Sequence, residues 1–185
     1  MQIFHMWKIL VGYIIMVDIS VDTEDVDRRL YIVREQILYH GSNLVVQNPR
    51  IMINGHYKDF GYGFYCTNIE KQAKRWAYTK RGKSIVNRYS YREDMNLNVC
   101  SFKEMTEDWL QFVVDCRLGI EHAYDIVEGP MADDQVWDYV EDYMAKVISK
   151  EAFWELVKFK YPTHQIVFCT ERALQTLRFE GSESI

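Results

Sequence analysis

Apolar and polar residues recur along this chain with two different periods. Over residues 85–92 ("IVNRYSYR") they alternate with a period of two, which is typical of a strand. After Thr106 the apolar residues from Trp109 to Cys116 recur at helical spacing, and Gly119 ends that pattern. Further strands are expected over residues 35–41, 63–67, 97–102, 124–127, 164–170 and 178–181, and further helices over 67–82, 134–148, 149–160 and 171–177. This mixed order predicts an α+β fold.

Local residue spacing makes three of these predictions more specific. Thr67 and Glu70 have the spacing of a capping box, so a helix is expected to begin there. The strand over 97–102 is expected to pair with the strand over 85–92 through the short connection "EDMN". Residues 44–46 ("LVV") are expected to form either a short strand or a bend.

The chain is expected to form one domain. Its 185 residues, 48% of them hydrophobic, are enough for a single core and too few for two comfortable ones. No repeat, low-complexity run or linker interrupts residues 36–185, and residues 1–35 are expected to form an N-terminal extension. The apolar run Ile9–Val17 covers nine residues, too few to span a bilayer, so no membrane anchor is expected. A signal peptide is left open, although no small-residue cleavage site follows the run.

Charge and cysteine content restrict the classes of partner and chemistry. The net charge of -5 argues against strong nucleic-acid binding, which needs a concentrated positive field. The four cysteines lie far apart, without a Cys-x-x-Cys pair. Buried thiols in a reducing cytoplasm are therefore expected rather than a metal site or a disulfide framework. A Cys-His hydrolase is disfavoured, because no cysteine stands where a helix start would activate it.

Three separated motifs carry the candidate chemistry: "LYHGS" (38–42), "FGYGFYCT" (60–67) and "HQIVF" (164–168). In this order they resemble the signature strands of ADP-ribosyltransferases of the diphtheria-toxin and poly-ADP-ribose polymerase type. There, a His-Gly strand end precedes a Gly-x-Gly-apolar-Tyr strand, and a later strand opens with glutamate. Over about residues 37–180 the chain also resembles a little-characterised bacterial family of that group, with the motifs "LYHGS", "KDFGxGFYxT" and "DIVxGPxADD". The resemblance implies split antiparallel β-sheets with flanking helices.

The resemblance also implies NAD as co-substrate, without a metal. Cleaving the bond between nicotinamide and ribose builds positive charge on the ribose, so the site must hold the substrate and stabilise that charge. By the resemblance, His40 would hydrogen-bond a ribose hydroxyl, and the Gly41 main chain would hold the nicotinamide amide. Gly61 and Gly63 would let the backbone bend beneath the dinucleotide, and Tyr65 would form a flat wall for the nicotinamide ring.

Two further positions complete the expected NAD site. Ser42 follows the His-Gly pair. Trp76 stands eleven residues beyond Tyr65, where polymerase-like relatives carry a second stacking aromatic; core packing is the alternative for this residue. His40, Tyr65 and Gln165 are expected to meet around one cleft. Some residues of the most basic stretch are expected near the NAD diphosphate and most on a solvated face; they are Lys71, Lys74, Arg75, Lys80, Arg81, Lys83 and Arg88.

The third motif departs from the family pattern, because Gln165 stands where the glutamate would be. An amide has no charge to favour an oxocarbenium ion, so mono-ADP-ribosyl transfer is expected rather than polymerisation. Another carboxylate would then supply the charge or deprotonate the acceptor. Asp133 and Asp134 are the candidates, and capping of the following helix explains them equally well. Asp125 and Glu128 are weaker candidates.

The sequence therefore favours an NAD-dependent mono-ADP-ribosyltransferase with an unknown protein or nucleic-acid acceptor. Alternatives are a catalytically weak NAD- or ADP-ribose-binding module, an NAD glycohydrolase, and a non-enzymatic protein-interaction domain. A cytoplasmic location is expected, with delivery to another cell and a cognate inhibitor protein left open.

Overall fold

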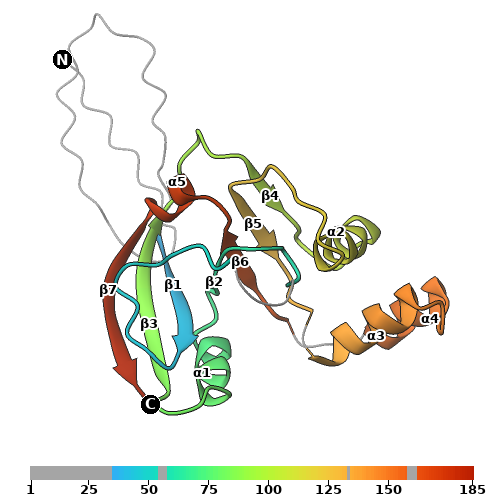
Figure 1. The fold of residues 1–185 in the computed structure, drawn as a ribbon, viewed down its shortest axis with the longest axis horizontal. Coiled ribbons are helices and arrows are strands. Elements are labelled where there is room, and N and C mark those ends of the chain that lie inside the picture. Colours follow the sequence, from blue (N-terminus) through green and yellow to red (C-terminus); the bar gives the residue numbers. More distant parts are fainter. Residues whose placement is uncertain (1–34, 54–57, 133, 158–161) are drawn as a thin grey trace, which may run out of the picture. The chain divides into compact units, whose positions relative to one another are not determined.

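The computed structural model describes residues 35–53, 58–132, 134–157 and 162–185. The predicted extension over 1–35 lies outside these residues, apart from Glu35. The elements form two sheets with helices around them, as the ribbon in Figure 1 shows. The α+β fold class predicted from the sequence is thus confirmed.

The first sheet is antiparallel and has the order β1–β3–β7 among the described residues. Its strands are β1 (Glu35–Ser42), β3 (Ile85–Arg92) and β7 (Leu177–Ser184). The second sheet has the order β2–β6–β5–β4 in the described part of the chain. Its strands are β2 (Phe64–Cys66), β6 (Gln165–Phe168), β5 (Ile126–Gly129) and β4 (Val99–Ser101).

The two sheets are joined where β1 meets the end of β2. The amide of Tyr39 donates to the carbonyl of Thr67 at 2.8 Å, and the amide of Thr67 donates back to the Tyr39 carbonyl at 2.9 Å. This bridge holds the "LYHGS" motif beside the "GFYCT" motif, although the two are separated by the long connection between β1 and β2.

Alternation along the strands of the second sheet produces two apolar layers. Phe64, Ile166 and Phe168 leave one face of this sheet and pack with residues of the first sheet such as Leu38 and Tyr89. Residues on the opposite face pack beneath the helices, in a core that includes Phe60, Trp109, Val113, Val127, Val136, Val140, Phe153 and Val167. The sheet is therefore covered on both faces.

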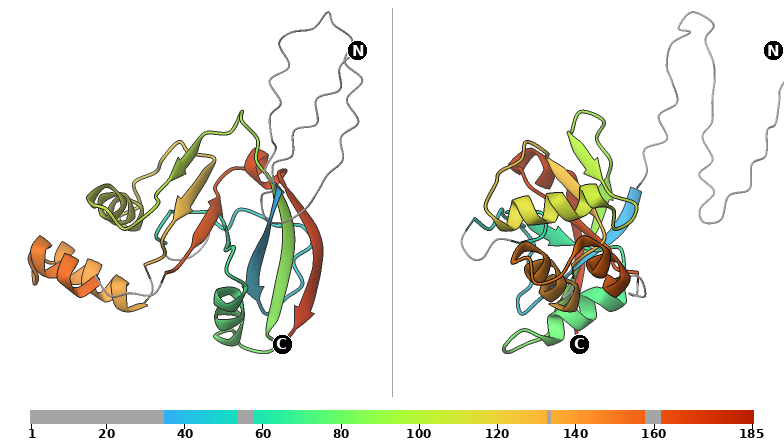
Figure 2. Two further views of the ribbon diagram at one scale, coloured as in Figure 1. Left: turned by 180° about the vertical axis from the view of Figure 1, so that it is seen from behind. Right: turned by 90° about the vertical axis from the view of Figure 1, so that its right-hand side faces the viewer.

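Five helices are described: α1 (Glu70–Tyr78), α2 (Glu107–Arg117), α3 (Asp134–Met144), α4 (Lys150–Val157) and the short α5 (Glu171–Leu174). Helix α1 packs along β1, as the left view in Figure 2 shows. Helix α2 begins as predicted, because the Thr106 hydroxyl accepts from the Trp109 amide. None of the described helices has the length and apolar character needed to cross a membrane.

The predicted capping box at Thr67 and Glu70 is wrong. Helix α1 begins at Glu70 with Ile69 as its N-cap, and the Thr67 hydroxyl accepts from the Ile69 amide at 3.0 Å. Glu70 instead pairs with Lys74 one turn along the helix, at 2.7 Å. The helix also ends at Tyr78, earlier than the predicted Gly82.

The predicted partner of the strand over 97–102 is also wrong. Strand β4 runs parallel to β5 in the second sheet instead of forming a hairpin with β3. Asp125 fixes this arrangement, because its carboxylate accepts from the Asn98 amide at 2.8 Å and its own amide donates to the Asn98 carbonyl at 2.8 Å. Residues 44–46 form no strand, which leaves the bend of the two predicted alternatives.

Candidate functional site

His40, near the end of β1, is held by the main chain of β2. Its Nδ1 lies 2.7 Å from the Tyr65 carbonyl oxygen. A carbonyl oxygen only accepts, so Nδ1 carries the proton and Nε2 of the neutral ring is an acceptor. Burial, with a smaller contribution from the nearby charges of Lys58 and Lys80, lowers the pKa of His40, while the bond to Tyr65 opposes this. His40 is therefore neutral at pH 7 and presents Nε2 as a hydrogen-bond acceptor.

Tyr65 is fixed by the turn that precedes β2. Its hydroxyl donates to the Gly61 carbonyl at 2.7 Å and accepts from the Phe60 amide at 3.3 Å. Burial, with the Asp59 charge adding to it, raises the pKa of Tyr65 well above its usual range, so the phenol stays neutral. The ammonium of Lys58 lies 4.6 Å from the centre of the Tyr65 ring. The ring face is therefore a place where a cation binds.

Each of the three glycines of the predicted site is explained by its own local structure. Gly61 has a φ of 74°, in the left-handed region, which directs its carbonyl toward the Tyr65 hydroxyl. A Cβ on Gly63 would lie 2.5 Å from a methyl group of Val167, so glycine permits the close approach of β2 and β6. A Cβ on Gly41 would overlap the main chain of α1 at Ala73. Packing thus accounts for the glycines at 41 and 63.

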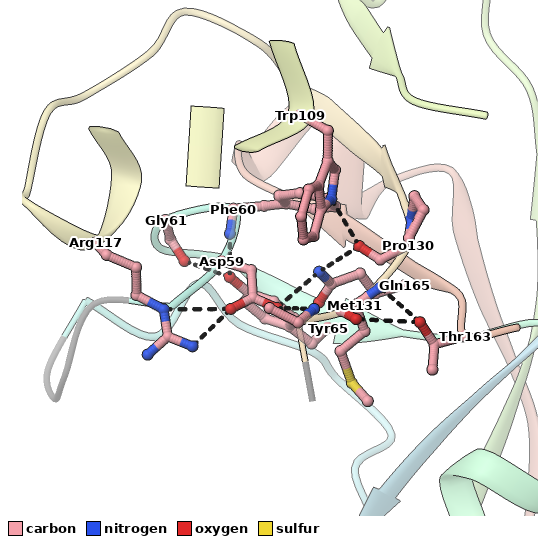
Figure 3. Close-up of polar contacts among 11 residues, drawn as sticks. Asp59, Phe60, Gly61, Tyr65, Trp109, Arg117, Pro130, Met131, Thr163 and Gln165 are labelled. Carbon is pink, nitrogen blue, oxygen red and sulfur yellow. Dashed lines mark hydrogen bonds and ion pairs between the residues drawn. The ribbon is translucent and has the colours of Figure 1, made fainter. Parts of the chain in front are cut away.

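A buried carboxylate that the sequence analysis missed lies at the centre of this region (Figure 3). Asp59 is 4% exposed, and its Oδ1 accepts from Arg117 Nε at 3.2 Å and Nη2 at 2.6 Å. Its Oδ2 accepts from the Ala132 amide at 2.9 Å and from Gln165 Nε2 at 3.1 Å. Asp59 therefore connects the turn before β2, the end of α2, the segment before α3 and the start of β6.

Gln165 is buried, 4% exposed, and its amide has a defined orientation. Its Nε2 donates to Asp59 and, at 3.3 Å, to the Pro130 carbonyl, which also accepts from Trp109 Nε1 at 3.0 Å. Both partners of Nε2 only accept, so the amide nitrogen must face them. Gln165 thus binds the carboxylate of Asp59, whose charge is balanced by Arg117.

The side chains of Tyr65 and Gln165 lie on one face of the second sheet, and His40 contacts the main chain of Tyr65. Tyr65 pairs with Val167 across β2 and β6, so the Tyr65 and Gln165 side chains leave the same face of the sheet. Both contact the segment 59–61, Tyr65 at Gly61 and Gln165 at Asp59. His40 joins them through the Tyr65 main chain, with its ring packed on Phe64, 4.5 Å between ring centres.

The other predicted residues lie at the edge of this group. Trp76 is 46% exposed on α1, and the Lys80 ammonium lies 4.4 Å from its ring centre. Ser42 ends β1, and its hydroxyl accepts from the Leu44 amide at 3.3 Å. Asp134 is the first residue of α3, but its side chain and all of Asp133 lie outside the described residues.

The two weaker acidic candidates have other partners. Asp125 is 2% exposed and binds Arg172 and the Thr170 hydroxyl, and the Arg172 bond keeps its pKa well below the usual range. It therefore fixes β4, β5 and the start of α5. Glu128 lies 2.8 Å from His164 Nε2.

The four cysteines are free thiols, with Cys66 and Cys116 buried and Cys100 and Cys169 half-buried. Burial raises the pKa of Cys66 well above its usual range, so this thiol is unreactive. Among the residues that the structure describes, no three His, Cys, Asp or Glu side chains group as metal ligands.

The fold and site define an α+β protein with two split sheets joined beside a histidine, a tyrosine and a buried acid–amide pair. A family model described as "Protein of unknown function (DUF3990)" matches residues 36–179. The match covers most of the chain and includes every residue of the candidate site, so the chain belongs to this family. No curated protein matches the sequence.

Proposed function

We propose that the chain is an NAD-dependent mono-ADP-ribosyltransferase. In this proposal ADP-ribose is transferred to a protein or nucleic-acid acceptor in the cytoplasm, and nicotinamide is released. The observation that carries the proposal is the 2.7 Å contact between His40 Nδ1 and the Tyr65 carbonyl at the junction of the two sheets. This contact joins two of the three motifs on which the sequence resemblance rests. Among the described residues Nε2 of the neutral imidazole has no hydrogen bond, so it can accept from a hydroxyl.

The proposed reaction breaks the bond between C1′ of the ribose and the pyridinium nitrogen of NAD. Nicotinamide leaves with the bonding electron pair and becomes neutral, while positive charge spreads over C1′ and the ring oxygen of the ribose. A lone pair of the acceptor then attacks C1′, and the acceptor loses a proton. His40 Nε2 would accept from a ribose hydroxyl and hold the sugar, and Tyr65 would provide the ring face for the cationic nicotinamide.

Gln165 supports transfer of a single ADP-ribose rather than polymerisation. Its amide brings no charge to the ribose and is bonded to Asp59, while the Asp59 charge is balanced by Arg117. Removing one preorganised electrostatic group costs an enzyme about 2.7–4 kcal/mol of transition-state stabilisation. We therefore expect slow turnover. Asp134, at the start of α3, remains the proposed carboxylate that deprotonates the acceptor.

The proposal is tested by nicotinamide release from NAD, with variants that separate the two faces of His40. His40→Asn keeps a donor at the position of Nδ1, where it can still bind the Tyr65 carbonyl, but has no atom at the position of Nε2. We expect it to fold and to lose at least 90% of nicotinamide release. If it releases nicotinamide at the wild-type rate, His40 has no role in the reaction.

Tyr65 permits a second matched pair of variants. Tyr65→Phe keeps the ring face and loses the bond to the Gly61 carbonyl, so we expect a small loss of activity together with a loss of stability of about 1 kcal/mol. Tyr65→Ala removes the ring and is expected to abolish release. Equal activity of these two variants would contradict a stacking role.

A binding module for NAD or ADP-ribose is the second candidate function. The uncharged Gln165, committed to Asp59, is the observation that favours it. Binding of NAD without release of nicotinamide would identify such a module. Release accompanied by free ADP-ribose, with no modified macromolecule, would identify a glycohydrolase.

A further inference from the structure

Two lysines lie over the two aromatic rings of the proposed site. Lys58 Nζ is 4.6 Å from the centre of the Tyr65 ring, and Lys80 Nζ is 4.4 Å from the centre of the Trp76 ring. The sequence resemblance gave both rings to the nicotinamide. The structure instead gives each ring a cation from its own chain.

The packing of α1 on β1 brings these two lysines to one region. Gly41, next to His40, lies against the α1 main chain at Ala77, and the Asn43 side-chain amide donates to the Arg81 carbonyl at 3.3 Å. The turn after α1, which contains Lys80, is thereby held beside the end of β1. Lys58 is linked to the same region by Tyr65. Its ammonium lies over the Tyr65 ring, and the Tyr65 carbonyl accepts from His40, the neighbour of Gly41.

Neither of these lysines has a carboxylate partner among the described residues, in contrast to Lys74 and Lys150. Lys74 pairs with Glu70 at 2.7 Å and Lys150 pairs with Glu107 at 2.5 Å. Within the described part of the chain, no ion pair involves Lys58 or Lys80. Partial burial lowers the pKa of Lys58 and the Lys80 charge lowers it further, while the Asp59 charge opposes this, so the two ammonium groups repel each other.

We propose that Lys58 and Lys80 form a binding site for the diphosphate of a dinucleotide or of ADP-ribose. Two neighbouring lysines that form no ion pair within the described residues offer the charge and the donors that a diphosphate accepts. Only the identity of the ligand as NAD rests on the proposed function. A diphosphate-containing ligand would satisfy the site without any reaction.

The nicotinamide of NAD would replace Lys58 on the Tyr65 ring. The nicotinamide of NAD is a cation, and a cation on the Tyr65 face can be exchanged for another without a change of charge there. Lys58 then moves from the ring to the diphosphate as the nicotinamide takes its place. After cleavage nicotinamide is neutral, the attraction to the ring weakens, and Lys58 returns.

The test is calorimetric binding of three probes to the full chain: inorganic pyrophosphate, ADP-ribose and adenosine. We expect Lys58→Gln/Lys80→Gln to weaken pyrophosphate and ADP-ribose binding about 100-fold, roughly tenfold for each charge-assisted hydrogen bond that the variant removes. Adenosine binding should not change. The matched control is Lys71→Gln/Lys74→Gln, which removes the same charge from α1 and its vicinity and should weaken each probe less than threefold. Circular dichroism confirms the fold of both variants.

Four outcomes decide the inference. Loss of diphosphate binding in the first double variant alone supports it, even if the wild-type protein releases no nicotinamide and the transferase proposal fails. Wild-type protein that binds neither pyrophosphate nor ADP-ribose overturns it. Equal weakening by the two double variants also overturns it, because general charge then explains the effect. Unchanged KM for NAD in Lys58→Gln/Lys80→Gln overturns it while leaving the transferase proposal intact.

Discussion

The buried carboxylate of Asp59 gives the most specific prediction about stability. Asp59→Asn changes one oxygen to an NH₂ group and keeps the shape of the side chain. Both carboxylate oxygens accept in the native structure, one from Arg117 and the other from Ala132 and Gln165. An asparagine must therefore direct its NH₂ group at donors on one of these two sides.

The magnitude follows from burial and from charge. Asp59 is 4% exposed, and the Arg117 side chain is 22% exposed, so water compensates little for the missing charge. Removing one partner of a buried ion pair costs about 3–5 kcal/mol, against a total stability of about 5–15 kcal/mol. For a chain of this size the melting temperature should fall by roughly 6–20 °C.

The assay is urea unfolding followed by circular dichroism, with Glu107→Gln as the matched control. Glu107 also pairs with a cation, Lys150, but their side chains are 67% and 41% exposed. The same acid-to-amide change there should cost less than about 1 kcal/mol. If Asp59→Asn costs no more than this control, the buried network does not hold the site together.

Three other substitutions test separate parts of the account. Gln165→Glu should lower the free energy of unfolding by about 3 kcal/mol at pH 7, because it buries a second carboxylate beside Asp59. Burial raises the pKa of the new acid above its unfolded value of about 4.3, so the loss should nearly vanish at pH 4. A loss in urea unfolding that does not depend on pH would contradict this. Gly41→Ala should cost about 2–3 kcal/mol in thermal unfolding, because the added methyl group meets helix main chain; a cost under about 0.5 kcal/mol would be the contrary result. Arg172 lowers the pKa of Asp125, so the stability that this acid contributes is complete above about pH 4 and is lost as the pH falls. The difference in stability between wild type and Asp125→Asn should therefore disappear in acid. A difference that stays constant with pH would argue against a stabilising pair of Asp125 with Arg172.

Local periodicity was sufficient to predict most of the fold. The alternation over 85–92 matches β3, and the apolar spacing after Thr106 matches α2, which extends over Glu107–Arg117. The pairing of β4 was wrong because a short connection suggested a hairpin, whereas the contact of Asn98 with Asp125 is made across 27 positions of the chain. Local spacing contains no information about such a partner.

The site was predicted only in part for the same reason. Motif order was enough to select His40 and Tyr65, which the structure brings into contact. Asp59 was missed because a single acid before Phe-Gly is typical of a turn. Its partner Arg117 is 58 positions away, so local spacing does not indicate the ion pair. The available signals were a charge next to the buried Phe60 and an arginine as the last residue of α2.

The central claim is that the imidazole of His40 acts on the ribose of NAD. The most direct measurement is chromatographic quantification of nicotinamide after the purified 185-residue chain is incubated with NAD, for wild type and His40→Asn side by side. We predict nicotinamide from the wild-type protein and at most a tenth as much from the variant, with matching circular dichroism spectra. No release from the wild-type protein, or equal release from both, would contradict the account.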